Sequence, residues 1–189
     1  MQNELEVKFL SINKNDMRTK LKNSGYSLVT PEYIMRRKTF DFSKIDTGKN
    51  KWGRVRQESD KITMTIKEVA GEGVNDTFEV ELIVNDFDTA TSFFEACNIH
   101  VKAFQENKRE VWKKDDIEVT IDTWPGLNPF IEIESSTEDK LKASSAELGY
   151  EYNNAVFGSI DMIYEKELGI PASTITKLPE ITFAIIPTK

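Results

Sequence analysis

Charged side chains recur at every second position in several segments of this 189-residue chain. Near the N-terminus, Glu4, Glu6 and Lys8 alternate with apolar residues, and the same spacing joins Arg54 with Arg56, Thr63 and Thr65 with Lys67, Glu79 with Glu81, and Glu132 with Glu134. Because successive side chains of a strand point to opposite faces, each set shares one face. Convergent carboxylates bind hard divalent cations, and convergent arginines and lysines bind phosphate oxygens. These residues therefore suit a site for a metal ion and a polyanion.

Each strand alone would also fit an ordinary antiparallel sheet with its charged face in water. The charges are sorted by sign, however: acids pair two residues apart in three strands, and arginines pair in another. Like charges at this spacing repel one another and gain nothing in water. A barrel of about eight strands has an interior wide enough for one small ligand. The alternative hypothesis is that the opposite charges meet around a shared hollow.

The elements that would position these residues follow from periodicity. Period-two alternation predicts strands at roughly 3–10, 33–41, 52–57, 61–69, 77–84, 102–113, 116–122 and 129–135, joined by short turns that favour antiparallel pairing. Helical patterns occur at 14–24, 87–97, 138–149 and, more weakly, 159–168. We predict an α+β fold in which helices pack outside a closed eight-stranded antiparallel β-barrel. Residues 1–170 would form this domain, and 171–189 an edge strand or a docked tail.

Composition narrows the class of protein. The net charge of −7 argues against a general binder of nucleic-acid backbones. A single cysteine and a single histidine exclude an intramolecular disulfide and a zinc site built from several such ligands. The polar start and the absence of a long apolar run predict a cytoplasmic protein with no membrane partner.

Three other residues attract attention without a clear chemical role. Cys97 follows Phe93 and Phe94 in a helical pattern, and we expect all three to fill the core. His100 is assigned no role. Trp124 lies in a loop after Asp122, where it either anchors the loop or stacks on an aromatic ring of a ligand.

The ordered motifs resemble the CYTH superfamily, also called triphosphate tunnel metalloenzymes. They are Glu4-x-Glu6-x-Lys8, then RVR at 54–56, TIK ending at Lys67, FEVE at 78–81, KREVW at 108–112 and IDTWPGLNPFIEIE at 121–134. The resemblance covers about residues 3–150. It implies an eight-stranded tunnel that requires Mg²⁺ or Mn²⁺ and acts on a small triphosphate-bearing molecule, in a monomer or a homodimer.

Site residues carry over by position. The resemblance implies metal ligands at Glu4, Glu6 and Glu132, and a phosphate grip formed by Lys8, Arg54, Arg56, Lys67 and Arg109. It further implies an acidic wall for a second metal or for orienting the nucleophile, formed by Glu79, Glu81, Asp122 and Glu134. We expect Asp122, Glu79 and Glu81 to act in catalysis and Glu134 to assist at the metal.

One position departs from the family pattern. Class IV adenylate cyclases carry a lysine two residues before the equivalent of Arg109, and here that residue is Asn107. Either Lys108 enters the site through a bulge, or the grip has one fewer cation. Further cations are available at 36–38, whose orientation the sequence leaves open.

Phosphoryl transfer needs neutralised phosphate oxygens and an in-line nucleophile, which metal ions and basic clamps supply. The favoured hypothesis is hydrolysis of the terminal phosphoanhydride of inorganic, thiamine or a nucleoside triphosphate. The first alternative is cyclisation of ATP to cyclic AMP and pyrophosphate, as in class IV adenylate cyclases. The second is a module that binds polyphosphate or nucleotide without turnover.

Overall fold

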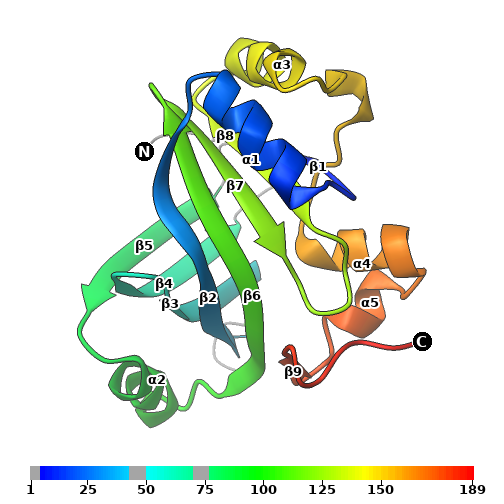
Figure 1. Ribbon diagram of the computed structural model, residues 1–189. Coiled ribbons are helices and arrows are strands. Elements are labelled where there is room, and N and C mark those ends of the chain that lie inside the picture. The colour runs from blue at the N-terminus through cyan, green and yellow to red at the C-terminus, as the bar shows by residue number, and fades with distance from the viewer. Residues whose placement is uncertain (1–4, 43–49, 70–76) are drawn as a thin grey trace. The chain divides into compact units, whose positions relative to one another are not determined.

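The computed structural model describes residues 5–42, 50–69 and 77–189. The strands are β1 (Leu5–Phe9), β2 (Ser27–Asp41), β3 (Asn50–Gln57), β4 (Ile62–Val69), β5 (Thr77–Val84), β6 (Val101–Lys114), β7 (Ile117–Thr123), β8 (Phe130–Ser135) and β9 (Glu180–Ile181). The helices are α1 (Lys14–Asn23), α2 (Phe87–Ala96), α3 (Glu138–Glu147), the 3-10 turn η1 (Tyr152–Asn154), α4 (Ile160–Leu168) and α5 (Ala172–Ile175). Every predicted strand and helix is present (Figure 1).

The strands form one α+β sheet in the hydrogen-bonded order β1-β8-β7-β6-β2-β3-β4-β5, and β9 adds a short parallel pairing to β6. In the described part of the chain this order ends at β5 without returning to β1. The other edge of β1 is partly occupied, because the Lys8 N–H and C=O bond to Val156 at 3.0 and 2.9 Å. The sheet is therefore not closed by hydrogen bonds here, and a closed barrel stays a prediction.

The chain folds into two compact units. Unit 1 comprises Met1–Tyr33, Asn107–Thr176 and Pro187–Lys189, and unit 2 comprises Ile34–Glu106 and Lys177–Ile186. The strands β2 and β6 each pass from one unit into the other. Each unit has its own hydrophobic core.

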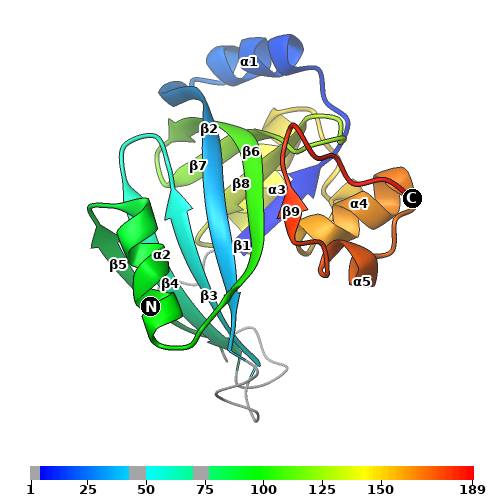
Figure 2. The ribbon, with the colours of Figure 1, turned by 90° about the horizontal axis from the view of Figure 1, so that it is seen from below.

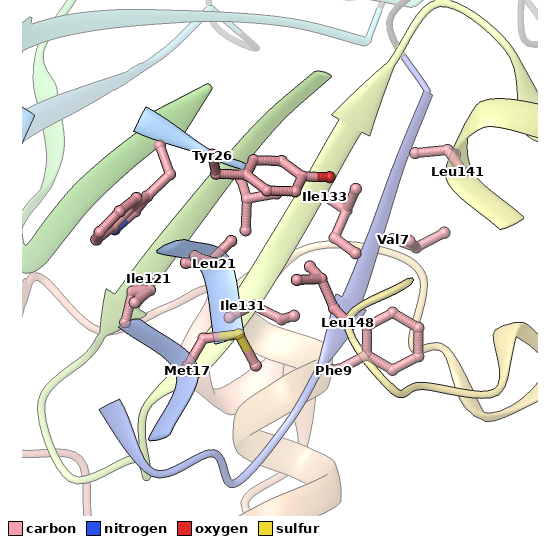
Figure 3. Packing of buried hydrophobic residues seen from close by; sticks show 12 residues of the cluster. Val7, Phe9, Met17, Leu21, Tyr26, Ile121, Ile131, Ile133, Leu141 and Leu148 are labelled. Carbon is pink, nitrogen blue, oxygen red and sulfur yellow. The ribbon is translucent and has the colours of Figure 1, made fainter. Parts of the chain in front are cut away.

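In unit 1, α1 and α3 cover the apolar faces of β1, β7 and β8 (Figure 3). Met17 and Leu21 lie four residues apart, so both point from α1 into the core. The Asn13 side chain caps α1 by accepting from the N–H groups of Asn15 and Asp16 at 2.9 and 3.2 Å. The strands contribute alternate residues, Val7, Phe9, Ile121, Ile131 and Ile133. Their other faces are left for the polar side chains.

In unit 2, α2 covers one face of the sheet around β3 and β4 (Figure 2). The buried face of α2 consists of Phe87, Ala90, Thr91 and Phe94, at helical spacing. Phe93 and Cys97 fall outside this stripe and are exposed, Phe93 to 60%. The expectation that Phe93 and Cys97 fill the core is therefore wrong, whereas Phe94 does so.

Two boundaries differ from the prediction. β2 starts at Ser27, six residues early, and passes through Pro31, because the fixed φ of proline is compatible with extended backbone. The C-terminal segment forms α5, the two-residue strand β9 and a turn between Thr182 and Ile185, so it combines a docked tail with an edge strand. Among the described residues, no helix has the length and apolar character needed to cross a membrane.

Candidate functional site

The polar face of unit 1 carries acids and bases on four neighbouring strands. The registers place Lys8 opposite Glu132, Glu132 opposite Thr120, and Asp122 opposite Arg109. Residues opposite one another in an antiparallel pair point to the same face. Side chains from β1, β8, β7 and β6 therefore share a single surface, as the alternation predicts.

These side chains form one continuous network. Lys8 Nζ donates to Glu6 Oε1 at 2.6 Å and lies 2.8 Å from Glu132 Oε1. Arg109 Nη2 donates to the other Glu132 oxygen at 2.9 Å and to Asp122 at 2.7 Å. The basic groups thus hold three carboxylates in fixed positions.

Asp122 is fully buried, and its carboxylate is saturated with donors. Arg109 binds it in a bidentate manner through Nε and Nη2, at 2.9 and 2.7 Å. Asn107 Nδ2 donates to Oδ1 at 2.8 Å, and Thr120 Oγ1 donates to Oδ2 at 3.0 Å. A carboxylate offers about four lone-pair sites, and all are used. This geometry orients Arg109 and leaves no acceptor for a substrate proton.

Electrostatics keeps the network ionised. Burial would raise the pKa of Glu132, but Arg109 and Lys8 outweigh it and lower the pKa to about 2. Burial would lower the pKa of Lys8, but the carboxylates of Glu132 and Glu6 raise it. The pKa of Glu6 is raised, first by burial and then by the negative charge of Glu132. By formal charge, Lys8 and Arg109 balance two of the three carboxylates of Glu6, Glu132 and Asp122, which leaves one negative charge.

That residual negative charge fits a divalent cation. Glu134 lies opposite both Glu6 and Glu118, which extends the carboxylates across three strands. Carboxylate oxygens are the ligands that Mg²⁺ and Mn²⁺ prefer. Within the described residues no three acidic, histidine or cysteine side chains converge closely enough to hold a metal ion. The predicted ligand Glu4 lies outside the described residues.

Unit 2 carries the complementary basic face. Its registers place Arg37 opposite Arg56, Arg54 opposite Thr65, and Trp52 opposite Lys67. Arg54, Arg56 and Lys67, predicted from alternation, thus share one face. Arg37 shares this face, whereas the sequence left open which of residues 36–38 does so.

Arg36 and Lys38, the neighbours of Arg37 on β2, point to the opposite face of the sheet. Arg36 lies over the Phe87 ring of α2 at 4.7 Å, and Lys38 lies 3.6 Å from Asp88. Both therefore serve the packing of α2. The register between strands decides that Arg37 faces the charged side while Arg36 and Lys38 do not. A single sequence does not specify this register.

Several donors on the basic face have no acceptor. The Nε atoms of Arg54 and Arg56 and the hydroxyl of Thr63 are buried and make no hydrogen bond within the described residues, whereas Arg56 Nη2 pairs with Glu58 Oε1 at 2.5 Å. Thr63 lies directly opposite Arg56. Burial, followed by the neighbouring Arg56, lowers the pKa of Arg54 to about 10. Unsatisfied buried donors under positive charge favour an anionic ligand.

The acids of unit 2 border this face on β5. Glu79 pairs with Lys67 at 2.7 Å, and Glu81 accepts from Thr65 Oγ1 at 3.0 Å. Both glutamates are exposed, so their carboxylates are open to solvent. Trp52 lies between Arg54 and Lys67, 5.8 and 5.9 Å from their charges, and adds an aromatic surface to the charged face.

The departure at Asn107 is resolved by register. The pairing of β6 with β7 is continuous from Lys108 opposite Thr123 to Lys114 opposite Ile117, with no bulge. Asn107 is fully buried and bonds to Asp122, so it lies on the Arg109 face. The polar face of unit 1 thus has an amide where the cyclases carry a lysine.

The loop after Asp122 supplies an anchor. Trp124 is only 5% exposed, which favours the anchoring role over stacking on a ligand. The adjacent Pro125 carbonyl accepts a hydrogen bond from Tyr164 Oη at 2.7 Å, so α4 also holds this loop.

Comparisons with known proteins agree with this arrangement. The chain is 26% identical over 140 residues to a Methanocaldococcus jannaschii protein provisionally named an adenylate cyclase, covering 72% of this chain and 78% of that protein. A Vibrio parahaemolyticus structure, also provisionally named an adenylate cyclase, superposes with a TM-score of 0.70 at 16% identity, over 87% of this chain and 98% of the other.

A Hippeastrum protein whose structure is described as revealing a dominant triphosphatase activity superposes with a TM-score of 0.56 at 14% identity, over 86% and 95% of the two chains. These structural likenesses concern the fold. The family model of the CYTH domain matches residues 2–153. The chain therefore belongs to the CYTH domain family, whose relatives support an enzyme that acts on triphosphates.

Proposed function

We propose that this protein is a divalent-metal-dependent enzyme that hydrolyses the terminal phosphoanhydride of a triphosphate-bearing substrate. The substrate class comprises inorganic, thiamine and nucleoside triphosphates. The observation that carries the proposal is a set of buried donors on the basic face of unit 2, the Nε atoms of Arg54 and Arg56 and the Thr63 hydroxyl, which have no acceptor among the described residues. Phosphate oxygens are the acceptors that these donors lack.

The residues have separate tasks. Arg54, Arg56, Lys67 and Arg37 bind phosphate oxygens, and the thiazolium or base of an organic substrate would find an aromatic surface at Trp52. In unit 1, Arg109 contributes a further cation, which Asp122 holds in a fixed orientation. We therefore propose that Asp122 positions Arg109, in place of the catalytic role expected from the sequence.

The carboxylates Glu6, Glu132 and Glu134, together with Glu4, would hold Mg²⁺ or Mn²⁺. When bound, such an ion would neutralise phosphate charge and lower the pKa of a coordinated water. Lys8 keeps Glu6 and Glu132 side by side before any cation arrives. Glu79 and Glu81 are accessible carboxylates that could orient the attacking water, which breaks the terminal P–O–P bond and releases orthophosphate.

Cyclisation of ATP is the second candidate, because all three of the similar proteins described above are provisionally named adenylate or adenylyl cyclases. Asn107 favours hydrolysis over it. An amide bonded to Asp122 supplies no positive charge to the phosphates at this position. The dominant triphosphatase activity described for the Hippeastrum protein lends the same support.

A substrate panel with product identification tests the proposal. Tripolyphosphate, thiamine triphosphate and ATP are incubated with the protein and Mg²⁺ or Mn²⁺, and products are separated by chromatography. We expect orthophosphate and the corresponding diphosphate. Cyclic AMP with pyrophosphate would establish the cyclase instead, and tight binding without any product would establish the binding module.

Matched variants tie activity to the two faces. Glu6→Gln and Lys67→Ala should each abolish most turnover. Glu151→Gln and Lys177→Ala change exposed residues of the same types in units 1 and 2 and should leave turnover unchanged. Equal activity of all four variants would refute the assignment of these faces.

A further inference from the structure

Glu58 places an acid at one end of the basic face of unit 2. Along β3 this face carries Trp52, Arg54 and Arg56 at every second position, and Glu58 follows at the same spacing. Its carboxylate lies beside the basic residues, since Glu58 Oε1 is 2.5 Å from Arg56 Nη2. Burial and Arg56 lower the pKa of Arg54, and the negative charge of Glu58 is among the effects that oppose them. Glu58 therefore belongs to the charged face and not to the surrounding solvent.

The turn between β3 and β4 holds Glu58 in place. Its N–H donates to the Lys61 carbonyl at 2.9 Å, which closes the turn. Its second carboxylate oxygen, Oε2, is 3.8 Å from Lys61 Nζ. The Glu58 side chain is only 16% exposed, so salt and solvent screen its charge less than they screen a surface charge. One carboxylate thus engages two cations, Arg56 and Lys61.

The pairing with Glu58 leaves only part of the Arg56 guanidinium for a ligand. Nη2 faces the carboxylate of Glu58, whereas Nε is buried and has no acceptor among the described residues. Thr63, which lies opposite Arg56, has a buried hydroxyl in the same condition, as does Arg54 at its Nε. Phosphate oxygens can satisfy these three donors directly. Arg56 Nη2 and Lys61 Nζ are open to phosphate only if the Glu58 carboxylate gives them up.

The row of available cations consequently has a limited length. It begins at Lys67, which lies opposite Trp52, and Arg56 is four residues further along β3, a span of about 13 Å. Glu58 comes next. A phosphate beyond Arg56 would meet a carboxylate of its own sign and would find the nearest donors already engaged. Such a phosphate would add little binding free energy.

We propose that Glu58 is a specificity-determining residue that limits the number of phosphates held by this face and favours tripolyphosphate over longer linear polyphosphates. This role rests on the proposed function, because it requires that Arg54, Arg56 and Lys67 bind phosphate oxygens. With the charge of Glu58 removed, Arg56 Nη2 and Lys61 Nζ would lengthen the row by two donors. Glu58 thus acts by competing with phosphate for cations and takes no part in bond breaking.

Calorimetric binding of tripolyphosphate and tetrapolyphosphate, in buffer without divalent cations, measures this selectivity independently of turnover. Glu58→Gln should raise the affinity for tetrapolyphosphate by about 10-fold or more, because two charged donors become available to the fourth phosphate. The affinity for tripolyphosphate should rise by about 3-fold or less, since this ligand gains only the removal of a nearby like charge. The ratio of the two affinities is the quantity that reports on Glu58. A purely structural role would change both affinities by the same factor.

Two further variants serve as matched tests. Asp60→Asn removes an exposed acid of the same turn and controls for the general effect of net charge, so it should leave the ratio unchanged. Adding Lys61→Gln to Glu58→Gln should remove most of the gain for tetrapolyphosphate, because Lys61 supplies one of the two released donors. All variants should keep the circular dichroism spectrum of the wild type, since glutamine and asparagine retain the backbone N–H groups and the size of the replaced side chains.

The outcomes separate this role from the proposed function. If Arg54→Ala weakens tripolyphosphate binding but Glu58→Gln leaves the ratio unchanged, the role of Glu58 is overturned and the phosphate grip stands. An equal change of the ratio in Asp60→Asn would overturn the role as well. Failure of the wild-type protein to bind tripolyphosphate would overturn both. A raised ratio in Glu58→Gln alone, reversed by the second substitution at Lys61, is the result that we expect.

Discussion

Replacing Glu132 with glutamine removes the acid that joins Lys8 to Arg109. The fold lowers the pKa of Glu132 from its ordinary 4.5 to about 2. A depression of this size corresponds to roughly 3 kcal/mol of stability at neutral pH. The Glu132 side chain is only 12% exposed, so solvent screens this interaction weakly. Glu132→Gln should therefore lower the free energy of unfolding by about 3 kcal/mol at pH 7.

The same shift predicts a pH dependence. Because the folded-state pKa is depressed, the stabilising contribution is complete above about pH 4.5 and is lost as the pH falls through 2. At pH 3, which lies just above the folded pKa, less than half of this stabilisation should remain. Glu6, whose pKa is raised, contributes in the opposite sense over its own titration. The gap between wild type and variant should thus be less than half as large at pH 3 as at pH 7.

Urea unfolding at the two pH values measures this gap. In a Trp52→Phe background, tryptophan fluorescence comes from Trp112 and Trp124, both buried in the unit that contains Glu132. Glu151→Gln, an exposed acid of the same unit, is the control and should match the wild type at both pH values. A gap below about 0.5 kcal/mol at pH 7, or one of equal size at both pH values, would refute the reasoning on the network.

Three further variants probe both units. Arg54→Ala should weaken tripolyphosphate binding by about 10- to 100-fold in calorimetry with unchanged circular dichroism, because it removes a charged donor; unchanged affinity would remove Arg54 from the grip. Asp122→Asn should destabilise the fold by about 3–5 kcal/mol in urea, since Arg109 loses its buried anion, and a loss below 1 kcal/mol would contradict this. Gly53→Ala should cost about 1–3 kcal/mol, since a Cβ there would lie 2.9 Å from Phe42 Cε2; an unchanged thermal midpoint would show that Phe42 moves aside.

Period-two alternation carries much of the information about this fold. It locates all eight long strands, and the faces that it assigns to Lys8, Arg54, Lys67 and Glu132 agree with the cross-strand registers. Alternation depends on the local geometry of a strand, which any pairing preserves. The elements and the faces were therefore predictable from the residues alone.

Register and packing were not predictable in this way. Arg36, Arg37 and Lys38 are equivalent as a sequence, and only the pairing of β2 with β3 assigns Arg37 to the charged face. Phe93 and Phe94 are equally apolar, and the direction from which α2 approaches the sheet decides that Phe94 is buried. Such choices depend on contacts between segments distant in the chain.

Asn107 illustrates how much of the candidate site could be predicted from the sequence. The sequence reveals the missing lysine, but a single chain does not say whether Lys108 replaces it. The bulge-free register of β6 with β7 and the hydrogen bond from Asn107 to Asp122 show that Asn107, and not Lys108, lies on the charged face. The roles of these residues in binding and catalysis stay predictions.

The central claim is that the carboxylates of Glu6 and Glu132 bind a divalent cation and that Arg54 and Lys67 bind a triphosphate. A crystal structure with tripolyphosphate and Mn²⁺, with manganese located by anomalous scattering, tests it most directly. We predict manganese at the carboxylates of Glu6 and Glu132, and tripolyphosphate oxygens in contact with Arg54 and Lys67. Tripolyphosphate bound away from Arg54 and Lys67, or manganese bound away from Glu6 and Glu132, would contradict the claim.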